Sequence, residues 1–230
     1  NRYPNLIIES CASGGNRFDL GMLCYFPQIW ASDDSDAVYR VNGQTGYSYG
    51  YPMSCVSAHV SDCPNHQTLR KTPMASRFQV AAFGVLGYEC NLCEMSSDDV
   101  KDIKEQITLY KKWREVLQYG TFYRGRVYEN NTYEWTCVSP DKKRAVGFEM
   151  QVLFNPNTHF ETYSPKGLDA DTKYHFTNRQ LKINIKEFGG LINQVVPFHI
   201  KQDSIIHNLA AKLVKMDAEK EDCVASGKLL

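Results

Sequence analysis

The chain contains 230 residues, and its 26 basic and 26 acidic side chains give a formal net charge of zero at pH 7. This balance excludes the strong positive field with which proteins bind nucleic acids or anionic membranes. Hydrophobic residues make up 43% of the chain, which is ordinary for a soluble globular protein, and no apolar run approaches the roughly 20 residues of a spanning helix. We therefore expect one large or two small globular domains, with no nucleic-acid or membrane partner.

Four short apolar segments follow one another in the first half of the chain, and each ends in polar or glycine residues. They comprise residues 6–11, 25–32, 53–60 and 80–87. Apolar runs without strict alternation are typical of strands that are buried on both faces of a parallel sheet. Because barrel enzymes carry their chemistry just after such strands, the four units predict an α/β fold with half of a (β/α)8 TIM-type barrel over residues 1–120.

A long amphipathic helix follows, and the texture of the sequence changes after it. Ser97 is expected to cap this helix, and Gly120 marks its end. Five later segments have the composition of strands separated by turns, namely residues 121–128, 133–138, 145–154, 173–176 and 181–188. The stretch 204–216 fits either a helix or two short strands. We place a domain boundary near residue 120 and expect residues 121–230 to form a truncated β domain.

Eight cysteines are spaced irregularly along the chain. Disulfide scaffolds belong mainly to short secreted proteins, so we predict free thiols and a reducing, cytoplasmic setting. Most of the cysteines lie in apolar segments, which predicts that they are buried. Cys90 and Cys93 have metal-ligand spacing, but a structural zinc site needs a second pair of ligands. We therefore predict buried thiols there, with no metal and no cofactor.

The main candidate for chemistry is the acidic cluster that follows the second apolar segment. Asp33, Asp34 and Asp36 come soon after Trp30. Sugar cleavage needs two carboxyl groups flanking the anomeric carbon, and an aromatic ring suits the apolar face of a sugar. The alternative is a solvated loop in which Asp34 or Ser35 caps the next helix, and spacing alone favours this alternative.

The second candidate is the turn Cys11-Ala12-Ser13-Gly14-Gly15-Asn16-Arg17, which follows the first apolar segment. Adjacent glycines expose backbone N–H groups that can meet a ligand. The turn lacks the Gly-Lys-Ser/Thr ending of a phosphate loop and the Gly-x-Ser-x-Gly pattern of a hydrolase elbow. A simple tight turn is the alternative. His59 and His66 are read as structural histidines, with loop orientation or sugar binding as the alternative.

Several of these motifs together resemble glycoside hydrolase family 36, the mainly bacterial α-galactosidases. Cys11, Gly14 and Arg17 are similar to the family's Cys-x-x-Gly-x-x-Arg motif, and residues 27–37 are similar to its acid/base segment. Three further segments are similar to family members: residues 57–68, 176–179 and 200–204. The resemblance implies the second half of the catalytic barrel followed by most of an antiparallel β-sandwich domain.

The resemblance also implies a retaining α-galactosidase that removes terminal α-linked galactose from oligosaccharides such as melibiose and raffinose. Asp33 matches the general acid/base, whereas Cys11 and Gly14 match residues that approach the galactose 2-hydroxyl. Arg17 completes the motif and is expected to hold its loop. Trp30 is expected to form a wall of the sugar pocket.

The family's nucleophile, an Asp in a Lys-x-Asp segment of an earlier strand, has no counterpart in this sequence. We therefore expect a piece of a longer bacterial enzyme that is inactive by itself, because a double displacement needs its nucleophile. The complete enzyme is expected to be a homo-oligomer. Two alternatives stay open: a galactosyl-transferring relative that is similar to raffinose synthases, and a non-catalytic galactose-binding or assembly module.

Overall fold

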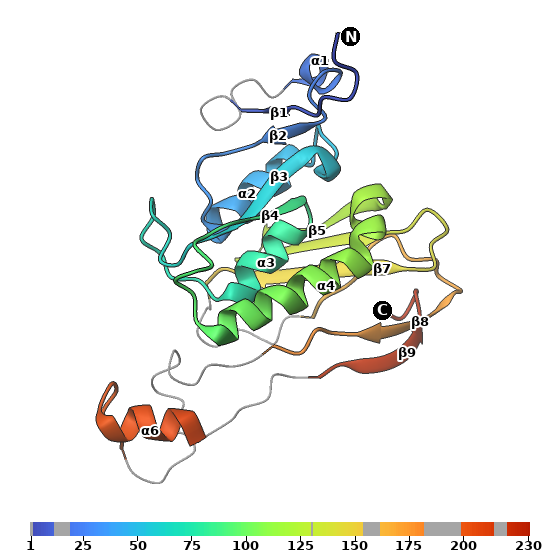
Figure 1. Ribbon diagram of the computed structural model, residues 1–230. Coiled ribbons are helices and arrows are strands. Elements are labelled where there is room, and N and C mark those ends of the chain that lie inside the picture. Colours follow the sequence, from blue (N-terminus) through green and yellow to red (C-terminus); the bar gives the residue numbers. More distant parts are fainter. Residues whose placement is uncertain (1, 12–18, 130, 154–161, 182–198, 214–219) are drawn as a thin grey trace. The chain divides into compact units, whose positions relative to one another are not determined.

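The computed structural model describes residues 2–11, 19–129, 131–153, 162–181, 199–213 and 220–230 (Figure 1). The chain divides into two compact units. The first contains residues 1–172 together with residues 227–230, and the second contains residues 173–226. The domain boundary that the sequence pattern predicts near residue 120 does not coincide with the division between these two units, and it stays a prediction.

The first unit begins with four parallel strands in the order β1-β2-β3-β4. The strands are β1 (Glu9–Ser10), β2 (Gln28–Trp30), β3 (Val56–Ser61) and β4 (Val85–Glu89). Between them lie α1 (Leu20–Leu23), α2 (Ala37–Tyr47), the short 3-10 helix η1 (Met53–Cys55) and α3 (Met74–Ala82). Trp30, the last residue of β2, pairs with Ser57 near the start of β3. The predicted α/β architecture with a parallel sheet is therefore confirmed for this part of the chain.

The fourth apolar segment divides differently from the prediction. Residues 80–82 end helix α3, and the strand begins only at Val85. Phe78, Ala81 and Ala82 recur at helical spacing and pack with residues of β3 in one apolar cluster. Gly84 makes the turn possible, because a Cβ at this position lies only 2.5 Å from the Val56 carbonyl oxygen.

The long predicted helix is confirmed as α4 (Ser97–Tyr119). Its N-cap is Ser96, one residue before the predicted Ser97, and the Ser96 hydroxyl accepts a hydrogen bond from the backbone N–H of Asp99. Acidic residues in the first turn suit the positive end of the helix dipole. Gly120 is the C-cap, as predicted.

Three antiparallel strands complete the first unit, namely β5 (Thr121–Glu129), β6 (Thr132–Val138) and β7 (Ala145–Gln151). Trp135 of β6 is fully buried, and its ring lies 4.6 Å from that of Phe148 and 5.4 Å from that of Phe83. Its indole nitrogen donates to the Thr45 hydroxyl of α2 over 3.0 Å. One core therefore joins this sheet to helices α2, α3 and α4.

The second unit contains an antiparallel pair of strands, β8 (Lys173–Thr177) and β9 (Asp222–Ser226), and helix α6 (Ile205–Leu213). The predicted strand at residues 173–176 is confirmed, and the undecided stretch 204–216 is helical over α6. Strand β9 was not predicted. Residues 182–188 of the strand expected at 181–188 lie outside the described residues.

The burial of the cysteine side chains differs from the prediction, which was that most of them are buried. Only Cys55 and Cys137 are buried, Cys90 is half-buried, and the other five cysteines, Cys93 among them, are exposed. All eight are free thiols. Burial raises the pKa of Cys55 to about 11 and that of Cys137 to about 12. Among the helices of the described ranges, none has the length and apolar character needed to cross a bilayer.

Candidate active site

The carboxyl end of β2 brings Trp30 and Asp33 together. The indole Nε1 of Trp30 donates a hydrogen bond to Asp33 Oδ1 over 3.1 Å. Asp33 is exposed, whereas Trp30 is half-buried. The carboxyl group is therefore accessible to a ligand while a fixed aromatic side chain holds one of its oxygens.

Short-range hydrogen bonds shape the loop after β2. The backbone N–H of Asp34 donates to the Ser32 hydroxyl over 3.2 Å, and that of Asp36 donates to Asp34 Oδ1 over 3.0 Å. The expectation that Asp34 or Ser35 caps the next helix is wrong. Asp36 is the N-cap of α2 and accepts from the Val38 backbone N–H over 2.9 Å. Asp33 precedes this cap and takes no part in it.

The loop after β3 fastens the loop after β2 from the side. Asp36 Oδ2 accepts hydrogen bonds from the Thr68 hydroxyl over 2.7 Å and from Arg70 Nη1 over 2.6 Å. The Asn65 amide donates to the Ser35 hydroxyl over 3.2 Å. The Asp36 side chain is only 1% exposed, so water screens its ion pair with Arg70 weakly on that side. These contacts hold the backbone that follows Asp33.

Arg40 of α2 is buried behind this loop. Its guanidinium lies 4.9 Å from the centre of the Trp30 ring. It donates to the Ser32 carbonyl over 3.4 Å and also to the Ser57 carbonyl of β3. Burial lowers the pKa of Arg40 to about 10, against the opposing influence of Asp34 and other groups. Arg40 thus stays cationic at neutral pH.

His59 of β3 contacts the Trp30 ring, with the two ring centres 4.5 Å apart. Its Nδ1 lies 3.7 Å from Glu89 Oε2, and its Nε2 lies 3.3 Å from the Ser57 hydroxyl. Burial lowers the pKa of His59 below its ordinary value of 6.5, although Glu89 and Glu9 act in the opposite direction. His59 is therefore neutral at physiological pH.

The structure places the predicted site residues unevenly. Asp33 and Trp30 are in contact, and Cys11 is an exposed residue directly after β1, which pairs with β2. Gly14 and Arg17 lie outside the described residues. Arg40 was not predicted as a site residue. In the sequence, Arg40 stands out only by its position four residues after Asp36. In the structure, it shares a buried face of α2 with Ala37, Val41 and Gln44.

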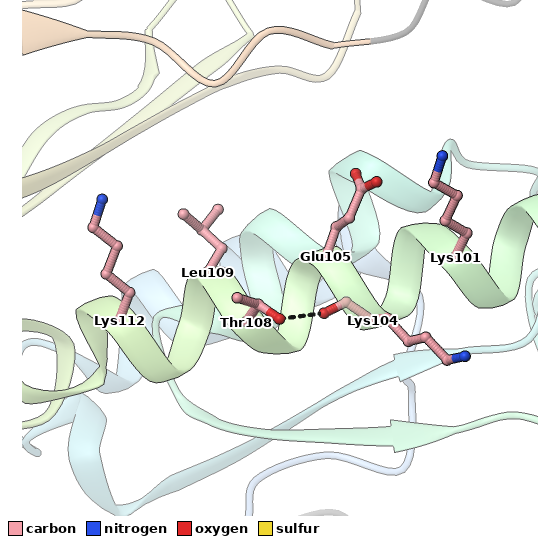
Figure 2. Close-up of a pocket in the computed structure, with 6 residues that line it drawn as sticks. All are labelled: Lys101, Lys104, Glu105, Thr108, Leu109 and Lys112. Atoms are coloured by element: carbon pink, nitrogen blue, oxygen red, sulfur yellow. Dashed lines mark hydrogen bonds between the residues drawn. The ribbon is translucent and has the colours of Figure 1, made fainter.

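Two other features of the described residues add nothing to this site. No group of three or more histidine, cysteine or acidic side chains within the described part of the chain is arranged to hold a metal ion. A shallow groove of about 450 Å³ runs along α4, and Thr108 donates to the Lys104 carbonyl there over 2.8 Å (Figure 2). Its lining residues are Lys101, Lys104, Glu105, Thr108, Leu109 and Lys112. All of them belong to one helix, and none follows a strand of the parallel sheet.

Residues 1–120 match the Melibiase family, and residues 132–230 match the glycosyl hydrolase family 36 C-terminal domain. The first match alone covers more than half of the chain. The chain belongs to glycoside hydrolase family 36. Among curated family 36 relatives, it is 42% identical over 173 residues to alpha-galactosidase Mel36A of Lactobacillus acidophilus, which covers 75% of this chain and 24% of the relative.

Solved structures of family 36 enzymes are similar to the chain as well. The α-galactosidase of Lactobacillus brevis is 43% identical with a TM-score of 0.74, over 77% of this chain and 24% of that one. AgaA of Geobacillus stearothermophilus, solved with raffinose, is 39% identical with a TM-score of 0.73, over 76% and 24%. The chain thus spans about a quarter of these relatives. Fungal relatives, such as a probable alpha-galactosidase of Aspergillus terreus at 40% identity, also match.

Proposed function

We propose that this chain is the part of a retaining α-galactosidase that carries its general acid/base. The observation that supports this best is the contact between Trp30 and Asp33 at the carboxyl end of a parallel strand, in a chain of family 36. The parallel strands β1 to β4 are the second half of a (β/α)8 barrel. The chain after residue 120 is a C-terminal β-sandwich domain.

In this mechanism Asp33 acts twice. Its protonated carboxyl first gives a proton to the glycosidic oxygen as the bond to the leaving sugar breaks. The resulting carboxylate then removes a proton from the water that hydrolyses the galactosyl–enzyme intermediate. The exposure of Asp33 leaves room for both the leaving sugar and the water. The nucleophile of the first step belongs to protein outside these 230 residues.

Sugar recognition is assigned to the turn after β1. The match of Cys11, Gly14 and Arg17 to the family motif supports roles for Cys11 and Gly14 at the galactose 2-hydroxyl and for Arg17 in holding the turn, and Trp30 is proposed as a wall of the pocket. Terminal α-linked galactose of raffinose-type oligosaccharides is the proposed substrate, because AgaA structures have been solved with raffinose and with stachyose. The complete enzyme is proposed to be a cytoplasmic homo-oligomer, and its cytoplasmic setting rests on eight free thiols.

The acid/base role of Asp33 is tested by Asp33→Ala in the complete protein, including any chain outside these 230 residues. Two substrates are compared. Raffinose has a poor leaving group that needs a proton, whereas 2,4-dinitrophenyl α-galactoside has a good leaving group that does not. We expect kcat/KM to fall about 10²–10⁴-fold for raffinose and far less for the aryl galactoside. Azide, which needs no general base, should accelerate turnover of the aryl substrate and yield α-galactosyl azide.

Asp62→Ala is the matched control, because Asp62 is an exposed carboxylate directly after the neighbouring strand β3. Asp62→Ala should leave kcat/KM unchanged for both raffinose and the aryl galactoside. Equal losses on both substrates in Asp33→Ala, with no effect of azide, would contradict the assignment. Galactosyl transfer to a sugar acceptor as the main product would instead favour the transferring relative.

A further inference from the structure

The hydrogen bond between Trp30 and Asp33 distinguishes the two carboxyl oxygens. The indole Nε1–H is a donor only, and it points at Oδ1 over 3.1 Å. A protonated carboxyl group carries its hydrogen on one oxygen and keeps the other as its better acceptor. While the Trp30 bond is present, Oδ1 is the acceptor in both protonation states. The transferable proton therefore sits on Oδ2.

Trp30 itself is held by side chains from two other elements. The Arg40 guanidinium of α2 lies 4.9 Å from the centre of its ring, and the His59 ring of β3 lies 4.5 Å from it. Arg40 also donates hydrogen bonds to the carbonyls of Ser32 and Ser57. One buried cation therefore contacts the Trp30 ring, the acid loop (residues 31–36) and strand β3.

His59 in turn depends on a glycine. A Cβ at Gly87 of β4 lies 2.4 Å from His59 Cδ2, which is closer than real side-chain atoms approach. Only glycine at this position allows the imidazole to lie where it meets Trp30. The positions of Gly87, His59 and Trp30 are thus linked across three neighbouring strands.

We propose that Trp30 is a positioning residue that assigns the catalytic proton to Oδ2 of Asp33, and that Arg40 and His59 hold its indole in place for this task. The proposal rests on the proposed acid/base role of Asp33. Other charged groups in this neighbourhood are Asp34 on the same loop, Glu9 on β1 and Glu89 on β4.

Trp30→Phe in the complete protein removes the N–H donor and keeps an aromatic ring. We expect kcat/KM for raffinose to fall roughly 5- to 20-fold more than kcat/KM for 2,4-dinitrophenyl α-galactoside, because the proton is no longer confined to one oxygen. Any lost contact between the ring and galactose lowers kcat/KM for both substrates alike.

His59 supplies a second test that leaves the indole N–H intact. His59→Ala removes the ring that contacts Trp30, so it should show the same selective loss on raffinose. His59→Phe keeps a ring in that place and should recover most of the loss. Tyr119→Phe, at a surface tyrosine that is 78% exposed, is the control and should match the parent enzyme. Circular dichroism of each variant is the check that it is folded.

The outcomes separate this proposal from the assignment of Asp33. If Asp33→Ala shows no dependence on the leaving group, the acid/base role itself fails. If Asp33→Ala behaves as expected but Trp30→Phe and His59→Ala lose activity equally on both substrates, only the positioning role is overturned. Selective loss in both variants, recovered by His59→Phe, supports it.

Discussion

The imidazole of His59 lies near charged groups from several elements, namely Glu9 of β1, Glu89 of β4 and Arg40 of α2. Burial is the largest influence, and it lowers the pKa of His59 in the folded protein below 6.5. At a pH between the folded and unfolded values, the unfolded chain binds more protons than the folded one. The contribution of His59 to stability is therefore complete above about pH 6.5 and declines as the pH falls below that value.

His59→Phe removes this titration and keeps a ring against Trp30. We expect the thermal midpoint of the parent protein to fall relative to that of the variant as the pH is lowered from about 7.5 to about 5.5. Thermal unfolding of both proteins across this range is the measurement. Two parallel curves would show that His59 does not titrate differently in the folded state.

The acidic cluster after an apolar segment drew attention to Asp33 and Trp30, but spacing alone favoured a solvated loop, and only the resemblance of residues 27–37 to the family's acid/base segment selected Asp33. Sequence reasoning did not reach Arg40, because an arginine in a polar helix is normally a surface residue. Burial of Arg40 becomes favourable only when the Ser32 and Ser57 carbonyls accept its hydrogen bonds. These two groups come together only in the folded chain. The roles of Cys11, Gly14, Arg17 and Asp33 in sugar chemistry stay predictions.

At the scale of elements, boundaries were harder to predict than element types. Residues 80–87 form one apolar run in sequence, yet the run contains the end of α3, a turn and the start of β4. Burial makes all three parts apolar, so hydrophobicity alone cannot separate them. The turn glycine Gly84 was the available signal.

Two glycines in the first unit should respond oppositely to alanine. A Cβ at Gly43, inside α2, meets nothing within 4 Å, so Gly43→Ala should stabilise the protein by about 0.4–1 kcal/mol. A Cβ at Gly84 lies 2.5 Å from the Val56 carbonyl oxygen and 2.8 Å from the Ala58 Cβ. Gly84→Ala should destabilise it by roughly 1–3 kcal/mol. Chemical denaturation of both variants tests this, and shifts of the same sign would refute the argument.

At the scale of the whole first unit, one core extends across the position where sequence texture changes. Ala37, Val80 and Val116 from the helices share this core with Trp135 and Phe148 from the antiparallel sheet. Periodicity reveals which face of an element is buried but not which partner covers it. The sequence therefore predicted both kinds of sheet without revealing that helices α2 to α4 pack against β6 and β7.

Trp135→Ala should destabilise both sides of this core. It removes a fully buried ring that contacts Phe83, Phe122 and Phe148, and it leaves the Thr45 hydroxyl without its indole donor. We expect a loss of about 3–5 kcal/mol. Hydrogen exchange should show weaker protection in α2 and α3 as well as in β5 to β7. Loss confined to the antiparallel sheet would show that the two parts unfold independently and would favour a boundary near residue 120.

Arg40 has a consequence for anyone who builds chimeric enzymes in this family. The acid loop ends at the Asp36 cap, yet the cation that supports its backbone and its tryptophan lies one helical turn further along. A graft that stops at the cap would place a foreign loop over a native arginine, or the reverse. A segment that keeps this loop together with its buried cation therefore runs from residue 30 to at least residue 40, and exchange experiments should cut after Arg40.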